Sequence, residues 1–269
     1  MRNALYWQAT DRLVYLDEQA TPEFWDARWN SEGFPAPVSQ RDEVLTVTPR
    51  YLESGARILE GGCGRANKVK AMVDAGYEAI GIDFAEDTVR QAKLNYPGLD
   101  VRRGDVRSLD FPDNYFDGYW SIGVIEHFWA GYDQILEEAA RILKPGGVLF
   151  LTAPWFSPYR IRKARKGGYG EVDSSSEPES FYQFALCRKE VCAKLKEHGF
   201  RLDRWQGLAS EISMKEDLSG LRRPIEWLFN SRGSLVKRVL RRSITSLMNP
   251  YCGHSFLAVA KRDADSSEN

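Results

Sequence analysis

One short segment constrains this chain more than any other: an apolar run that ends in a cluster of glycines. It reads Ile58-Leu-Glu-Gly-Gly-Cys-Gly-Arg-Ala66. A chain that leaves a strand and turns at once into a helix needs positive φ or a close backbone approach, which Gly61, Gly62 and Gly64 permit. The next apolar run ends in Asp83, 19 residues after Gly64, an interval that suits one helix and one short strand. The pattern predicts a strand, turn and helix that form a site for a nucleotide-type cofactor.

The glycine turn does not complete the dinucleotide fingerprint G-x-G-x-x-G. Gly62-Cys63-Gly64 is followed by Arg65, Ala66 and Asn67, so the third glycine is missing. A nicotinamide-dependent oxidoreductase is therefore disfavoured, although it remains an alternative interpretation of the chain.

Further motifs follow the glycine turn in a fixed order along the chain. They are Gly81-Ile-Asp83-Phe-Ala85 after the second apolar run, Gly104-Asp105-Val106 after the third, Phe116 to His127 around the fourth, and Arg141 to Leu151 around the fifth. With Glu60-x-Gly62-x-Gly64-x-Ala66, this series resembles the class I S-adenosylmethionine-dependent methyltransferases over about residues 55–155, and more weakly to residue 206. Ala66 departs from the family, which usually has glycine at that position.

The resemblance implies S-adenosyl-L-methionine as the cofactor and S-adenosyl-L-homocysteine as the product. Asp83 would hold the ribose hydroxyls, Phe84 would pack near the adenine, and Asp105 with Val106 would contact the adenine edge and face. Glu60 and the backbone of the glycine turn would hold the methionine part. The expected cofactor-binding residues are Glu60, Gly61, Gly62, Cys63, Gly64, Asp83, Phe84, Asp105, Val106, Ser121 and Ile122. Asp83 and Asp105 also have a plainer interpretation, because Asp often caps turns and helices.

Strand and helix patterns alternate along most of the chain. Apolar residues recur at helical spacing in 86–96 and 132–143, between short apolar runs, and this alternation predicts an α/β fold with a parallel sheet. The resembled fold is a Rossmann-like, doubly wound sheet of seven strands, mostly parallel with an antiparallel last strand, here 256–260. Ligands of such sheets bind outside the carboxyl ends of the parallel strands.

Three segments lie outside this predicted core and should gather around the site. We expect an N-terminal helical arm or cap at 1–50, a methyltransferase domain at 51–261 that contains a lid at 155–184 and a helical insertion at 208–250, and a disordered polar tail at 262–269.

The N-terminal arm carries a stripe of aromatic residues, with Trp25 and Trp29 four positions apart. This spacing places the two indoles on one helical face. Core packing is the favoured interpretation. The alternative is an aromatic wall over the cofactor, where the rings would exclude water and face the sulfonium cation.

Basic residues cluster in the lid and in the insertion. Residues 160–166 hold five cations, and 235–248 reads as a basic amphipathic helix. A solvated helical cap is the favoured interpretation of the second cluster, and contact with an anionic membrane or acidic substrate is the alternative. Both clusters favour a small acceptor that carries phosphate or carboxylate, or is lipid-like.

Composition limits the remaining possibilities. The 269-residue chain has a formal net charge of −1 and 43% hydrophobic residues, which suits one domain with insertions. Its four cysteines show no metal-binding spacing and suit a reducing cytoplasm. No apolar run approaches the roughly 20 residues of a membrane span, and residues 1–11 do not resemble a leader. We expect a cytoplasmic protein without a metal or a nucleic-acid partner, and its oligomeric state remains open.

His127 is the candidate catalytic residue, because it follows the fourth predicted strand at the mouth of the expected site. An imidazole can take a proton near neutral pH. The alternative, slightly favoured, is that His127 orders the turn or contacts the cofactor. The sequence thus predicts methyl transfer to an oxygen or nitrogen atom of a small molecule. A non-catalytic S-adenosylmethionine-binding sensor or subunit is the main alternative.

Overall fold

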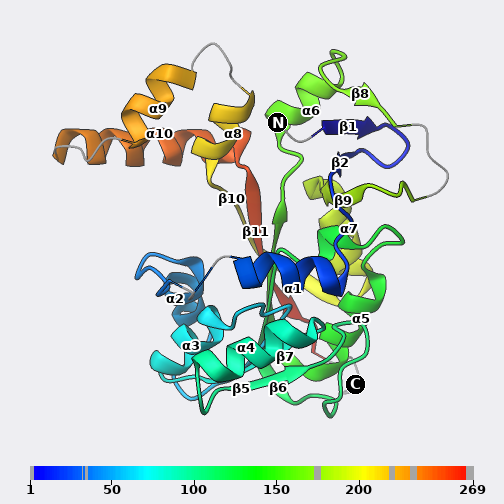
Figure 1. Cartoon of the computed structure of the whole chain (residues 1–269), viewed down its shortest axis with the longest axis vertical. Coiled ribbons are helices and arrows are strands. Elements are labelled where there is room, and N and C mark those ends of the chain that lie inside the picture. The colour runs from blue at the N-terminus through cyan, green and yellow to red at the C-terminus, as the bar shows by residue number, and fades with distance from the viewer. Residues whose placement is uncertain are drawn as a thin grey trace.

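A seven-stranded sheet forms the centre of the molecule (Figure 1). The structure is a computed structural model that describes residues 3–31, 33, 36–172, 177–217, 222–230 and 235–264. The strand order is β10-β11-β7-β6-β3-β4-β5, and only β11 runs antiparallel to its neighbours. This confirms the predicted Rossmann-like sheet. The strands are β3 (Arg57–Gly61), β4 (Glu78–Asp83), β5 (Asp100–Arg103), β6 (Phe116–Ile122), β7 (Leu143–Pro154), β10 (Phe200–Leu208) and β11 (Ser255–Arg262).

Helices cover both faces of this sheet because the strands are apolar on both sides. On one face, α2 (Glu43–Val47), α3 (Asn67–Asp74) and α4 (Glu86–Asn95) share a buried core with β3, β4 and β5. On the other face, α5 (Asp133–Ile142) and α7 (Arg188–Glu197) complete the second core. Single 3₁₀ turns at Thr48–Arg50 and Ile125–His127 follow α2 and β6. The doubly wound arrangement leaves the carboxyl ends of β3, β4 and β6 free to form a site.

A second, four-stranded sheet corrects the prediction for residues 1–50. Its order is β8-β1-β2-β9, with β1 (Asn3–Trp7), β2 (Arg12–Leu16), β8 (Gly170–Glu171) and β9 (Phe181–Ala185). Residues 3–16 therefore form a hairpin rather than part of a helical arm. The physical reason is a distant partner: Leu13 pairs with Ala185, and Leu13 and Val14 become fully buried. The predicted lid, 155–184, supplies β8 and most of β9 to this sheet.

The remaining helices lie around the carboxyl edge of the large sheet (Figure 1). They are α1 (Pro22–Ser31), α6 (Pro158–Ala164), α8 (Ser210–Asp217), α9 (Arg222–Asn230) and α10 (Leu235–Cys252). The described residues of the predicted insertion, 208–250, include helices α8, α9 and most of α10, which continues to Cys252. Strand β11 continues to Arg262, so the predicted tail begins too early, and 265–269 lie outside the described residues. Among the helices that the structure describes, none combines the length and apolarity needed to cross a membrane.

Candidate functional site

A pocket lies where the carboxyl ends of β3, β4 and β6 meet. Its empty space, counting the part open to solvent, is about 750 Å³. Seven of the eleven expected cofactor-binding residues line it, together with His127. The lining residues are Ala20, Trp25, Trp29, Gly62, Gly64, Asp83, Phe84, Gly104, Asp105, Val106, Arg107, Ile122, Gly123, Val124, His127 and Phe128.

The glycine turn forms the floor of the pocket as the sequence predicts. Gly62 and Gly64 have φ of +72° and +51°, a region that glycine enters without a steric penalty. A Cβ on Gly62 would lie 2.4 Å from Cγ2 of Val124, so a larger residue there would have to displace that side chain. Ala66 also has a positive φ, +59°. The alanine that replaces the family's usual glycine therefore keeps the backbone conformation of the motif.

Asp83 joins the two loops that bound the floor. Its Oδ2 accepts the amide of Gly64 at 2.7 Å, and its Oδ1 accepts the amide of Ala85 at 3.0 Å. Burial raises the pKa of this carboxyl, although the amide hydrogen bonds oppose the shift. The turn-capping interpretation of Asp83 is thus correct. It does not exclude the cofactor role, because the same side chain lines the pocket and each carboxylate oxygen can accept more than one hydrogen bond.

Asp105 lines another side of the pocket together with an arginine that the sequence reasoning missed. Both carboxylate oxygens of Asp105 accept hydrogen bonds from the Arg107 guanidinium, at distances from 2.6 to 3.1 Å. These bonds hold the pKa of Asp105 below its usual value. The Arg107 guanidinium also lies 5.2 Å from the centre of the Phe128 ring. This wall therefore offers a ligand a carboxylate whose charge is already compensated.

Helix α1 contributes an aromatic wall. Trp25 and Trp29 stack with ring centres 5.7 Å apart, and both line the pocket. A Cβ on Gly64 would lie 3.3 Å from the Trp29 indole, so this ring lies directly against the glycine turn. No residue of α1 is buried. The core-packing interpretation is therefore wrong for Trp25 and Trp29, for which the alternative of an aromatic wall agrees with the structure. It holds for Trp7, another aromatic residue of the arm, which packs against the buried core.

Asp26 attaches helix α1 to helix α4. Its Oδ1 accepts the backbone amide and the hydroxyl of Thr88, both at 2.7 Å, and its Oδ2 accepts the amide of Asp87 at 3.3 Å. The N-cap residue of α4 is Ala85, whose side chain offers no hydrogen bond. Asp26 therefore caps α4 from a different helix, a role that local sequence patterns did not reveal.

His127 lines the pocket with a defined orientation. Its Nδ1 lies 2.7 Å from the backbone oxygen of Tyr182 in β9, and its ring meets that of Trp25 edge to face at 5.2 Å. A carbonyl only accepts hydrogen bonds, so Nδ1 carries a proton and Nε2 is the ring nitrogen able to take one. The turn-ordering role of His127 is therefore present, and the orientation is also compatible with a general base.

Four of the expected cofactor-binding residues lie beneath the pocket instead of lining it. Glu60, Cys63 and Ser121 are buried, and burial raises the pKa of Glu60 to about 8. Gly61 lies against the ring of Tyr119, whose hydroxyl would be 2.2 Å from a Cβ at that position. These four residues lie under the floor of the pocket, so direct cofactor contacts by them remain a prediction.

Two cations of the predicted lid, Arg160 and Lys163, already have acidic partners. Arg160, almost fully buried, bonds to Oδ2 of Asp217 at 2.9 Å and to Glu216 at 3.1 Å. Lys163 bonds to Oδ1 of Asp217, also at 2.9 Å. His254 lies 3.5 Å from Glu216. This network attaches α6 to α8, so Arg160 and Lys163 give no support to an anionic acceptor.

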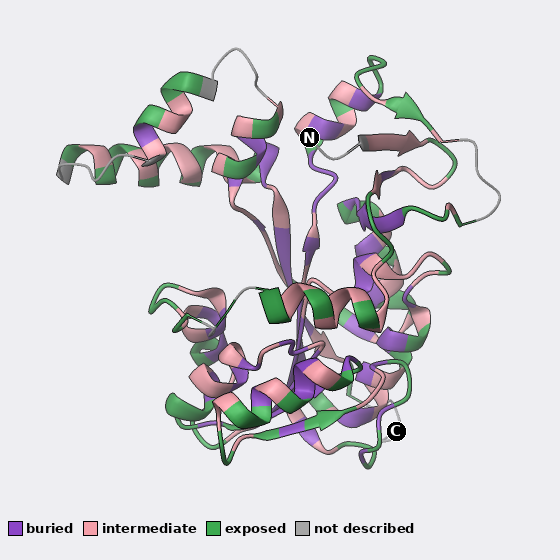
Figure 2. Ribbon diagram, in the orientation of Figure 1, coloured by how far each residue is buried: buried purple, intermediate pink, exposed green. Residues whose placement is uncertain are grey.

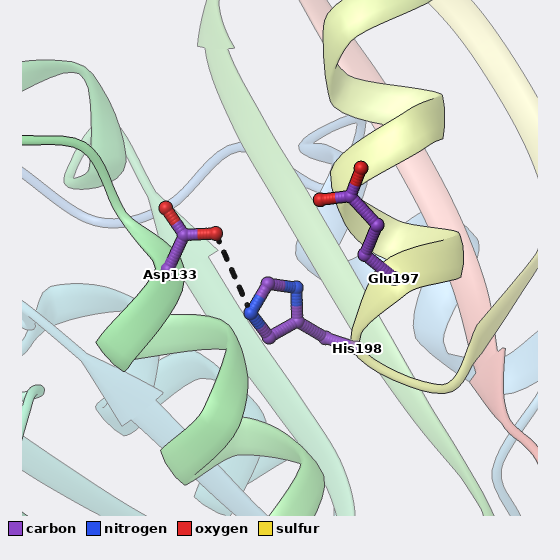
Figure 3. A group of neighbouring side chains, drawn as sticks. All are labelled: Asp133, Glu197 and His198. Atoms are coloured by element: carbon purple, nitrogen blue, oxygen red, sulfur yellow. Dashed lines mark ion pairs between the residues drawn. The ribbon is translucent and has the colours of Figure 1, made fainter.

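A cluster of three possible metal ligands lies away from the pocket lining. Figure 3 shows Asp133 at the start of α5 facing His198 at the end of α7, beside Glu197. The Lys194 ammonium lies 2.6 Å from Asp133 and 3.4 Å from Glu197, so both carboxylates already have a counter-ion. We interpret the cluster as an ion-pair contact between two helices, and the expected absence of a metal stays a prediction.

The fold and the glycine turn together define a Rossmann-like domain with a pocket for a nucleotide-type cofactor. Residues 59–151 match a family described as a methyltransferase domain. A relative in Mycolicibacterium smegmatis, named "Probable S-adenosylmethionine-dependent methyltransferase", is 35% identical over 45% of this chain and 48% of its own. The "Fatty-acid O-methyltransferase" of that organism is 30% identical over 43% and 46%. Residues 59–151 therefore belong to a methyltransferase domain family, and the sheet around them has the Rossmann-like fold of the class I S-adenosylmethionine-dependent methyltransferases.

Solved structures agree with this family at the level of the fold. A [4+2]-cyclase, SpnF, has a TM-score of 0.57 with 18% identity, covering 93% of this chain and 98% of its own. A methyltransferase from Archaeoglobus fulgidus has a TM-score of 0.52 with 18% identity, covering 90% and 94%. The chain spans less than half the length of the two M. smegmatis relatives that it matches.

The residues present fit the cofactor that the family implies. The glycine turn forms the floor of the pocket, where Gly62 and Gly64 present backbone and no side chain. Asp83 and Phe84 adjoin this space, with a carboxylate and an exposed aromatic ring. Indole faces at Trp25 and Trp29 suit a cation. A ribose, a planar base and a positively charged sulfur would each find a matching group.

Proposed function

We propose that this protein transfers the methyl group of S-adenosyl-L-methionine to an oxygen or nitrogen atom of a small, lipid-like or anionic acceptor. The observation that carries the proposal is the pocket itself. Gly62, Gly64, Asp83 and Phe84 match the family's motifs in sequence and line one cavity at the carboxyl edge of the sheet. Helix α1 covers that cavity with aromatic side chains.

The chain's own residues mainly have to bind the cofactor and the acceptor and to orient them toward each other. The cofactor, when bound, supplies an electrophilic methyl group on a sulfonium. Asp83 would accept hydrogen bonds from the ribose, and Phe84 would pack on the adenine. Trp25 and Trp29 would exclude water and face the positive charge. In-line substitution gains up to about 7–11 kcal/mol from orientation alone in ideal cases, so few reacting side chains are needed.

His127 would act as the general base for an acceptor that must lose a proton. Its Nδ1 donates to Tyr182, which leaves Nε2 as the proton-accepting nitrogen. A hydroxyl or ammonium acceptor would need this step, whereas a carboxylate is already ionised near neutral pH. The role of His127 therefore depends on the acceptor.

A second cavity is our candidate for the acceptor. It lies between the small sheet, α6 and α8, and Tyr15, Arg160, Gln183, Asp217 and His254 are among its lining residues. Gln183 directly follows Tyr182, whose carbonyl orients His127, so β9 adjoins both cavities. Relatives named "Fatty-acid O-methyltransferase" and "Phthiotriol/phenolphthiotriol dimycocerosates methyltransferase 1" favour a lipid-like acceptor.

A second candidate function is a protein that binds the cofactor without transferring its methyl group. One observation favours it: the fold is shared with the [4+2]-cyclase SpnF. The fold alone therefore does not specify methyl transfer.

Calorimetric titration with S-adenosyl-L-methionine and S-adenosyl-L-homocysteine tests the cofactor site. We expect binding by the intact protein, loss of binding by Asp83→Ala, and weaker binding by Phe84→Ala, whose ring does not support the fold. Asp74→Ala, at an exposed position outside the pocket lining, is the matched control and should bind normally. An intact protein that binds neither compound would overturn the proposal.

Turnover separates the two candidate functions. Labelled cofactor is incubated with the protein and either a long-chain fatty acid or a phenolic lipid. Release of S-adenosyl-L-homocysteine with a methylated lipid supports transfer. Cofactor binding without turnover on any acceptor of these classes would favour the non-catalytic protein.

A further inference from the structure

Helix α10 carries an exposed apolar stripe. Val236, Leu240, Leu247 and Tyr251 follow one another at intervals of four, seven and four residues, which places them on one side of a helix. Each of these side chains is between 46 and 74% exposed. We call these four residues the α10 stripe. The helix packs through a different side, where Cys252 is buried and Ile244 and Met248 are half-buried.

Exposed apolar side chains are concentrated in this part of the molecule. Ten large hydrophobic residues are exposed in the described part of the chain, and only three of them lie outside helices α8 to α10. The seven in these helices are Ile212, Trp227, Val236, Val239, Leu240, Leu247 and Tyr251. Scattered exposed residues need no explanation, but exposed apolar side chains that gather in one part of a molecule indicate an interaction site. Figure 2 shows exposed residues along both α9 and α10.

Positive charge accompanies the stripe. Helices α9 and α10 contain six cationic residues and one acidic residue: Arg222, Arg223, Lys237, Arg238, Arg241, Arg242 and Glu226. The whole chain has a net charge of only −1, so this excess is local. Two copies that met through the α10 stripe would bring these cations together. The charge therefore disfavours a symmetric dimer and favours an anionic partner.

Trp227 adds a feature typical of membrane interfaces. Its ring is exposed, and the Lys237 ammonium lies 3.7 Å from the ring centre. Arg241 Nε donates to the backbone oxygen of Leu228 at 2.5 Å. These contacts attach α9 to α10. An indole beside an ammonium suits the headgroup region, where one end of a side chain is apolar and the other wet.

We propose that α9 and α10 form a docking surface for a bilayer that contains anionic lipids. The α10 stripe enters the boundary between headgroups and acyl chains, and the positive charge of both helices attracts the anionic lipid surface. The contact is peripheral, because no described helix can span a membrane. Docking does not rest on the proposed function. If that function also holds, the surface brings a lipid-like acceptor close to the cavity bounded by α8.

Vesicle sedimentation of the full chain, without cofactor, tests the docking surface. The probes are vesicles of phosphatidylcholine alone and of phosphatidylcholine with one quarter phosphatidylglycerol. We expect binding to the second kind that weakens as salt increases. Leu247→Glu should weaken it by at least about tenfold, and the pair Arg238→Gln and Arg242→Gln by about tenfold or more.

Leu94→Glu is the matched control, because Leu94 is 66% exposed on α4, far from the insertion in sequence. It should bind vesicles as the intact protein does. Equal vesicle binding by Leu247→Glu and the intact protein would overturn the proposal, as would equal binding to both kinds of vesicle. A lipid-free dimer that Leu247→Glu dissociates would assign the stripe to a second copy instead. Cofactor titration of the same variants reports separately on the proposed function.

Discussion

Replacing Asp26 with alanine should loosen helix α1 and weaken cofactor binding. Asp26 is a strong attachment of α1 to the large sheet's helices: it accepts two bonds from Thr88 at 2.7 Å and one from Asp87 at 3.3 Å. Since α1 buries none of its own residues, loss of these bonds should open α1 locally and leave the rest of the fold intact. Trp25 and Trp29 would then leave the pocket with it.

The size of the effect follows from the cap. A lost capping side chain costs about 0.5–2 kcal/mol, and a middle value of about 1.4 kcal/mol shifts the docking equilibrium of α1 by about tenfold. We take the free energy that favours the docked over the undocked state of α1 to be no more than about 1.4 kcal/mol. A tenfold decrease of the docking equilibrium constant then lowers the docked fraction by about two- to fivefold. The apparent Kd for S-adenosyl-L-methionine should rise by the same factor.

Two measurements check this reasoning together. Amides of α1 should exchange with deuterium up to about tenfold faster in Asp26→Ala, and calorimetry should show the weaker Kd. Asp42→Ala is the control, because Asp42 caps α2 through the amide of Val44 and does not line the pocket. It should lower stability with Kd unchanged. Faster exchange of α1 with an unchanged Kd would show that α1 does not cover the cofactor, and unchanged exchange would show that Asp26 does not hold α1.

Two further predictions concern Glu126 and His127. Burial raises the pKa of Glu126 from 4.5 to about 8. The folded protein therefore keeps this proton where the unfolded chain releases it, and stability should fall between about pH 4.5 and 8, by about 5 kcal/mol at most. Urea unfolding across this range should show a shallower fall for Glu126→Gln, and parallel curves would contradict the assignment. His127→Asn keeps a donor for Tyr182 but removes the base. Turnover should fall by about 10²–10⁴-fold with a hydroxyl acceptor and stay unchanged with a carboxylate; equal losses with both would exclude the base.

The central sheet could be predicted because its signals are local. Gly62 and Gly64 must adopt positive φ, and Asp83 follows after one helix and one strand, so a single stretch of chain specifies the turn, its helix and its neighbouring strand. Seven of the predicted residues accordingly line one pocket. Of the four that do not line it, Glu60, Gly61 and Cys63 belong to β3 and its turn, and Ser121 belongs to β6. Sequence spacing cannot separate the exposed side of these segments from the buried side.

The elements that cover the site depend on distant partners. Residues 3–16 form strands because β2 pairs with β9, whose residues lie more than 160 positions later. Asp26 caps α4, which begins about 60 residues later in the sequence, and Arg160 forms its ion pairs with acidic residues of α8. Trp25 and Trp29 show the limit clearly: their spacing correctly predicted a shared helical face, but nothing local showed what that face covers.

The extent of the family match also separates the motif residues of the pocket from the elements that cover it. The family match ends at residue 151, and it includes Asp83, Phe84 and Asp105 but neither helix α1 nor the insertion. Residues that contact a shared cofactor must meet the same chemical groups in every member, whereas the acceptor differs between members. The acceptor should therefore be decided by α1, the small sheet, α6 and α8. Variants in these elements should change which acceptor is used, while Kd for the cofactor responds mainly to the glycine turn, Asp83 and the α1 wall.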